Sequence, residues 1–279
     1  MKFGVREICD VVFKAKSSGK IGSMPVTEGQ PVLYIDSAKT STLEGAATSV
    51  YAQGGRGNAR LISWEGEKTL TFTVEDALLS PIGFSILSGA GLLDCEKKSV
   101  HVHTTAHAYA DAEGKIDLSD VLDAEETIDK DAPVFVMTME DGSITGMVSG
   151  AQADGTTITA ASAKESNVFV DFYVLKNSDV TELQIDAENF AGNYYVEAST
   201  LFRRESDGKD LPAEITLPNV KIQSNFTFSM ASTGDPSTFT FTMDAFPGYT
   251  AFDKTKKVLC VIQVVEDTDN SNKEVTSVM

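Results

Sequence analysis

Alternation of polar and apolar residues is clearest between residues 69 and 76, which read Thr-Leu-Thr-Phe-Thr-Val-Glu-Asp. On an extended chain the threonines fall on one side, and Leu70, Phe72 and Val74 fall on the other. This pattern predicts a strand with one face packed on a core and the other face in water.

Further runs rich in β-branched and aromatic residues predict a mainly β protein. Residues 168–175 are apolar at most positions and indicate a central, buried strand. Asp141-Gly142 and Asp154-Gly155 lie beside such runs, and Asp-Gly at this place is a strong hairpin signal. Glu113-Gly114 and Gly234-Asp235-Pro236 indicate further turns. The other strand candidates are residues 3–13, 31–36, 134–139, 143–148, 156–160, 181–187, 192–204, 214–217, 221–230, 237–243 and 256–266.

A single short helix is predicted over about residues 77–88. Asp76 is one candidate for its N-cap and Ser80 is the other, because Pro81 is tolerated in a first turn. Gly89-Ala90-Gly91 would end the helix.

Residues 37–60 are small, polar and glycine-rich and show no clear periodicity, so we expect a long loop there. In a self-assembling protein, such a loop could become ordered against a neighbouring subunit. Trp64 follows it and is either a core or turn anchor or a contact with the next subunit, since aromatic residues concentrate at interface hot spots. The candidate interface residues are Tyr51, Arg56, Asn58, Arg60 and Trp64.

The composition of the 279 residues supports a packed core, because 42% are hydrophobic. There are 41 acidic and 23 basic residues, a net charge of −18, which disfavours binding to a polyphosphate such as DNA. An acidic wall would let DNA slide past, although acidity could equally serve solubility alone. We expect no membrane segment and no signal peptide, and Cys9, Cys95 and Cys260 are expected to be reduced thiols.

Motifs for chemistry are weak throughout. His101, His103 and His107 are the only histidines and would share one face of a strand, as a metal site or as a solvent-facing stripe. Residues 111–132 are acidic but do not fit a calcium loop, and the glycines at 54–57 match neither a dinucleotide-binding nor a P-loop pattern. We therefore expect no catalytic site and no cofactor.

Four stretches of the chain, just under a fifth of its residues, share a further likeness: residues 57–80, 190–198, 218–228 and 234–239. They resemble bacteriophage tail tube proteins, particularly those of contractile-tailed phages.

The resemblance implies a β-sandwich or barrel formed by residues 1–95 and 176–279, with residues 96–175 as an inserted or second β domain. It further implies that six subunits form a ring and that rings stack into a tube, through which phage DNA passes without specific binding. Tail sheath and baseplate or neck proteins would be partners. The location would be the tail of the virion, after assembly in the host cytoplasm.

Other functions remain open at this point. The chain could be a different virion protein, such as a head decoration or tail-associated protein. It could be a β module that binds carbohydrate, or calcium through residues 111–131. An enzyme that uses the three histidines and a metal is the last alternative.

Overall fold

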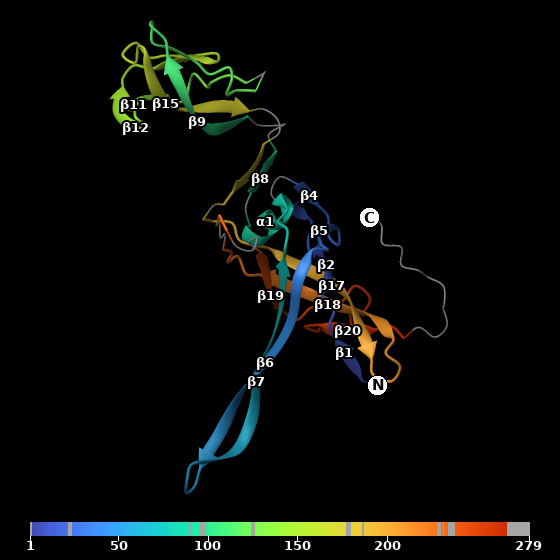
Figure 1. The fold of residues 1–279 in the computed structure, drawn as a ribbon. Helices are drawn as coiled ribbons and strands as arrows, with labels where there is room; N and C mark the ends of the chain where they lie inside the picture. Colours follow the sequence, from blue (N-terminus) through green and yellow to red (C-terminus); the bar gives the residue numbers. More distant parts are fainter. Residues whose placement is uncertain are drawn as a thin grey trace. The chain divides into compact units, whose positions relative to one another are not determined.

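The computed structural model describes residues 2–21, 24–89, 91–94, 99–123, 126–176, 180–185, 187–227, 230, 232–233 and 238–266. Cys95, the predicted turn at 234–236 and the residues from 267 onward lie outside this set. The chain divides into two compact units (Figure 1). The first contains Met1–Leu92 and Leu183–Met279, and the second contains Leu93–Glu182.

The first unit is built on one antiparallel sheet of nine strands, in the order β5-β2-β17-β18-β19-β7-β6, with β1 also paired to β17 and β20 to β18. The sheet is not closed into a barrel. Its strands are β1 (Phe3–Val5), β2 (Asp10–Ala15), β5 (Pro31–Ile35), β6 (Ala38–Gly54), β7 (Ala59–Asp76), β17 (Asn193–Arg204), β18 (Asp210–Ile222), β19 (Phe239–Ala245) and β20 (Val261–Val264). Two short two-stranded sheets are also formed among the described residues. One pairs β3 (Gly19–Ile21) with β4 (Met24–Val26) in the first unit, and the other pairs β8 (Gly91–Asp94) with β16 (Thr181–Gln184), two strands that the division into units cuts at Leu92 and Leu183.

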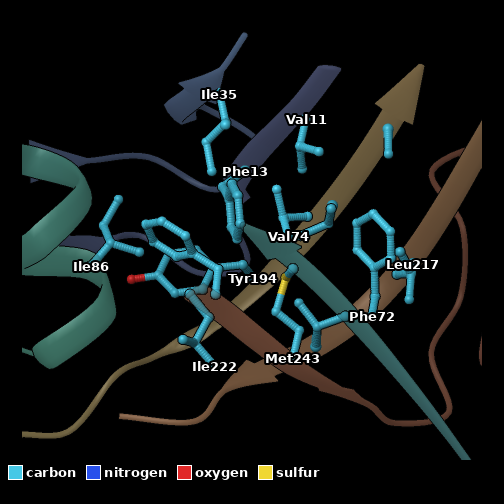
Figure 2. Close-up of a cluster of buried hydrophobic side chains, with 14 of the residues drawn as sticks. Val11, Phe13, Ile35, Phe72, Val74, Ile86, Tyr194, Leu217, Ile222 and Met243 are labelled. Carbon is cyan, nitrogen blue, oxygen red and sulfur yellow. The ribbon is translucent and has the colours of Figure 1, made fainter. Parts of the chain in front are cut away.

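The core of the first unit lies on one face of this sheet (Figure 2). Phe72 and Val74 of β7 are buried, whereas Thr71 and Thr73 are more exposed, so the predicted alternation is confirmed. Phe13 of β2 packs on Phe241 and edge-on against Tyr194, with ring centroids 5.9 and 6.0 Å apart. Strands far apart in the sequence are therefore joined by aromatic contacts.

The helix α1 (Pro81–Ser88), the only one among the described residues, begins four residues later than the start predicted at residue 77. Ser80 is the N-cap, since its side chain accepts a hydrogen bond of 2.9 Å from the Gly83 amide. Asp76 is instead buried and accepts hydrogen bonds from the Ser37 hydroxyl and the Leu78 amide. Gly89 ends the helix in the left-handed conformation, and Figure 2 shows Ile86 pointing into the core.

The second unit has a core of its own, between a four-stranded sheet in the order β12-β11-β15-β9 and a three-stranded sheet in the order β10-β14-β13. The predicted central strand at residues 168–175 is confirmed, because β15 lies inside the larger sheet and buries every second side chain. The strands are β9 (Val100–Ala110), β10 (Lys115–Asp117), β11 (Phe135–Glu140), β12 (Ser143–Val148), β13 (Gln152–Asp154), β14 (Thr157–Thr159) and β15 (Ser166–Lys176).

The turns of the second unit lie where the sequence indicates. Asp141 and Gly142 both have positive φ, 48° and 77°, which is the conformation that a two-residue hairpin turn requires. Gly155 and Gly114 also have positive φ at their turns.

Three strand predictions in the C-terminal third need correction. Residues 214–217 are only part of β18, and the strand expected at 221–230 ends at Ile222. Beyond Ile222 the chain leaves the sheet. Phe226 there packs edge-on against Phe84 of α1, with ring centroids 5.0 Å apart. The strand expected at 256–266 is reduced to β20, because the residues before it form an exposed loop.

We expect Leu217→Ala to lower the free energy of unfolding of the first unit by about 2–5 kcal/mol, because Leu217 is fully buried in the core. Leu78→Ala is the matched control, since Leu78 is exposed and its loss should cost no more than about 0.5 kcal/mol. Urea denaturation of dilute protein measures both. Equal effects would show that the core is not where the structure places it.

Candidate assembly surface

The longest feature of the first unit is the hairpin formed by β6 and β7, which Figure 1 shows extending away from the sheet. Near its base, residues 71–76 of β7 also pair with β19 and are held by the core. Beyond Thr71, β7 pairs only with β6. No residue between 44 and 69 is buried, so the outer half of the hairpin has no core on either face.

This hairpin replaces the long loop predicted at residues 37–60, and that prediction was wrong. The chain reverses at residues 55–58, where Gly55, Gly57 and Asn58 adopt positive φ. Alternation in a sequence arises when one face of a strand is buried. Since neither face of the outer hairpin is buried, its strands carry no such pattern.

One face of the outer hairpin is apolar. Val50 lies directly opposite Trp64, and Ala52 lies opposite Ile62, so these four side chains share a face. A β-bulge places Leu61 between the Ile62 and Arg60 positions. Val50, Leu61, Ile62 and Trp64 are 53–67% exposed. A contiguous exposed apolar surface of this kind is typical of an interaction site.

The opposite face is polar and carries an aromatic–cation pair. The Arg60 guanidinium lies 4.1 Å from the centre of the Tyr51 ring. An exposed cation–π contact of this kind contributes about 0.5–1 kcal/mol and holds both side chains in place. The two faces of the hairpin therefore offer different chemistry to a partner.

All five interface residues predicted from the sequence lie on this hairpin. Tyr51 is on β6, Arg60 and Trp64 are on β7, and Arg56 and Asn58 are in the turn. Trp64 is 53% exposed, so it is not a core anchor. Sequence reasoning missed Val50, Leu61 and Ile62. The apolar pair Leu61-Ile62 beside Trp64 was the available signal, but only the strand register shows that Val50 joins them.

The edges of the large sheet are a second candidate surface. β5 and β6 stand at its two ends, and in the described part of the chain no further strand pairs with the outer side of either. An exposed edge presents main-chain donors and acceptors that can pair with a strand from another chain.

The three histidines lie on the exposed side of β9 in the second unit. His101 Nδ1 is 2.7 Å from an Asp129 carboxylate oxygen, and His103 Nε2 is 3.1 Å from Asp171. His107 instead packs edge-on against Phe169. Across the described residues, no three histidine, cysteine or acidic side chains lie close enough together to hold a metal ion.

Several acidic residues of the 111–131 segment cap turns. Asp111 accepts hydrogen bonds from the Glu113 and Lys115 amides, and Asp129 accepts one from the Asp131 amide. These bonds stabilise the charged carboxylate and lower the pKa of Asp129. The thiols of Cys9 and Cys260 are free, and burial raises both pKa values, that of Cys260 to about 11, so neither is primed as a nucleophile.

The negative charge is unevenly divided between the units. The second unit has 18 acidic and 6 basic residues, a net charge of −12, whereas the first has 23 acidic and 17 basic residues, a net charge of −6. Two thirds of the net negative charge therefore belongs to the second unit, because it has few basic residues.

Comparison with known proteins gives one assignment. No curated protein matches the chain. In the described part of the chain, no helix has the length and apolar content that crossing a bilayer requires. Residues 3–260 match the model of the YomU/Tube protein family, a span that includes both units and supports the resemblance to phage tail tube proteins. The chain therefore belongs to the YomU/Tube protein family.

Proposed function

We propose that this protein is the structural subunit of a phage tail tube, that its subunits form stacked rings, and that the rings enclose a channel for phage DNA. The observation that carries the proposal is the outer half of the β6–β7 hairpin, which exposes an apolar face that one chain alone leaves in water. Family membership supports the same role.

The outer hairpin needs a partner for physical reasons. An isolated two-stranded ribbon is marginally stable in water, because it lacks a buried face. Covering Val50, Ile62 and Trp64 with a neighbouring subunit would contribute about 1.5–3 kcal/mol for each large side chain that becomes fully buried. The hairpin is long enough to reach past its own sheet, which suits a contact between one ring and the next (Figure 1).

Ring closure would use the two ends of the large sheet. If β6 of one subunit pairs with β5 of the next, every subunit uses its β6 edge to contact one neighbour and its β5 edge to contact the other. Such a head-to-tail contact generates a closed ring when the rotation between subunits divides a full turn. The resemblance implies six subunits per ring.

The channel wall would be the sheet face opposite the core. On β7 and β19 this face carries Thr71, Thr73, Thr242 and the carboxylates of Glu75 and Asp244, with no lysine or arginine at these positions. Hydrogen bonds from Thr238 and Thr40 lower the pKa of Glu75 and keep it charged. The same face also carries Lys221, which lies opposite Asp244, and Lys14, which is ion-paired with Glu197. Because these lysines lie beside carboxylates, the wall would hold phosphates weakly and would let DNA pass.

This role is structural rather than catalytic and places the protein in the tail of the virion, after assembly in the host cytoplasm. Contacts with sheath, baseplate or neck proteins follow from the resemblance to contractile tails, and the free ends of the tube are where end-binding partners would attach.

Amide hydrogen exchange should separate the two halves of the hairpin in the unassembled protein. We expect fast exchange in residues 45–68 and slow exchange in residues 71–76, because only the second group is held by a core. Assembly should slow exchange in the outer half. Equal protection of both halves before assembly would show that the outer hairpin is stable without a partner.

The double variant Ile62→Ser/Trp64→Ser should remain folded but raise the protein concentration needed for tube formation at least about tenfold, because two large apolar contacts are lost. Ser63→Ala, on the opposite face, is the matched control and should assemble normally. Negative-stain electron microscopy over a concentration series measures this. Unchanged tube formation by the double variant would exclude the apolar face as a subunit contact.

A further inference from the structure

The second unit also has an uncovered sheet face. Strands β9, β15, β11 and β12 bury one set of side chains in their own core and direct the alternate set outward. The register places the outward side chains in adjacent rows across these strands. They include Tyr109, Phe135, Met137, Met147, Phe169 and Tyr173.

This outer face is rich in aromatic side chains. His103 lies beside Tyr173 and His107 beside Phe169, with ring centroids 5.5 and 5.4 Å apart. Met147 is 72% exposed and Phe135 is 45% exposed. Aromatic residues and methionine with few charges are the composition of the centre of a protein–protein interface.

The charge of this region selects the kind of partner. The outward positions of the four strands include Asp171 but no lysine or arginine. The β11–β12 turn adds Glu140 and Asp141 at one end. With a net charge of −12 on the whole unit, nucleic acids and acidic proteins are repelled. A suitable partner is both apolar and cationic.

The first unit carries a segment with this chemistry, the loop of residues 246–257 before β20. Phe252 is 98% exposed, and Tyr249 and Phe246 are 42% and 45% exposed. Lys254, Lys256 and Lys257 follow, and Asp253 is the only acidic residue in the loop.

The loop is held in a defined shape. Asp253 Oδ1 accepts hydrogen bonds from the Thr255 amide and hydroxyl, and the Asp253 amide donates one of 3.0 Å to Thr250 Oγ1. Gly248 and Val258 form a β-bridge across its base. Because this shape exists before binding, presenting Phe252 to a partner costs less conformational entropy.

We propose that the outer aromatic face of the second unit binds loop 246–257 of a second copy of the chain. Phe252 packs on the aromatic rows, and the lysines face Asp171, Glu140 and Asp141. A hollow of about 320 Å³, lined by His107, Met139, Asp141 and Asn167 among others, opens at this end of the face and gives the phenyl ring a place to enter. The loop of each copy binds the aromatic face of one neighbour, and its own aromatic face binds the loop of another neighbour, so the contact repeats from subunit to subunit.

This inference rests on the self-association proposed above, and cross-linking tests the two separately. Full-length chains that are ¹⁵N-labelled and unlabelled are mixed in equal amounts, assembled, and treated with a carbodiimide, which joins lysine amines to carboxylates in contact. We expect mass spectrometry to find Lys254, Lys256 or Lys257 joined to Glu140, Asp141 or Asp171 in pairs of mixed isotope. The yield should fall at least tenfold in 1 M salt, which screens the charges.

Phe252→Ser should also lower this cross-link yield at least tenfold. Phe190→Ser is the matched control, because Phe190 is an exposed phenylalanine of the first unit outside the loop, and it should leave the yield unchanged. Tubes without these cross-links would overturn the loop contact and leave the proposed function standing. Cross-links confined to single-isotope pairs would overturn it too, since the contact would then lie within one chain. Absence of any assembly would overturn both.

Discussion

One physical constraint governs this molecule: a chain that folds with large apolar surfaces in water must cover them by association. The outer half of the β6–β7 hairpin has no buried residue between positions 44 and 69, yet it carries Val50, Ile62 and Trp64 on one face. A two-stranded ribbon gains little stability from its own contacts. The base of the same hairpin is held by Phe72 and Val74 in the core, so the outer half is presented at a fixed position.

The division of charge between the units changes how the acidity of the chain is interpreted. A net charge of −18 suggests a DNA conduit, but −12 of it belongs to the second unit. The local charge of a channel wall would therefore be set by the face of β7 and β19, where threonines and carboxylates predominate and Lys221 of β18 lies opposite Asp244. In the second unit the same negative charge serves a different purpose, because it selects a cationic partner for an aromatic surface.

The sequence predicted those parts of the fold in which burial is one-sided or in which a turn has strict chemistry. Residues 69–76 alternate because Phe72 and Val74 meet the core, and Asp141-Gly142 supplies the two positive φ angles of its turn. The outer hairpin was missed because unburied strands carry no alternation. The sequence left two candidates for the N-cap of α1, Asp76 and Ser80. Only the fold shows that the Asp76 carboxylate accepts a hydrogen bond from the Ser37 hydroxyl instead of capping the helix. Trp64, Arg60 and Tyr51 were named from the sequence, but only the fold shows that Val50 lies opposite Trp64 and that Arg60 lies over the Tyr51 ring. The sequence of one chain does not show which surface of a neighbouring subunit they would contact.

Trp64 is the only tryptophan of the chain, so its fluorescence reports directly on the apolar face of the hairpin. The most direct test is to record its emission maximum and its quenching by acrylamide in unassembled protein and in tubes. We predict a solvent-exposed spectrum and strong quenching before assembly, followed by a shift to shorter wavelength and protection from acrylamide in the tubes. An emission maximum and quenching that stay the same when tubes form would contradict the account.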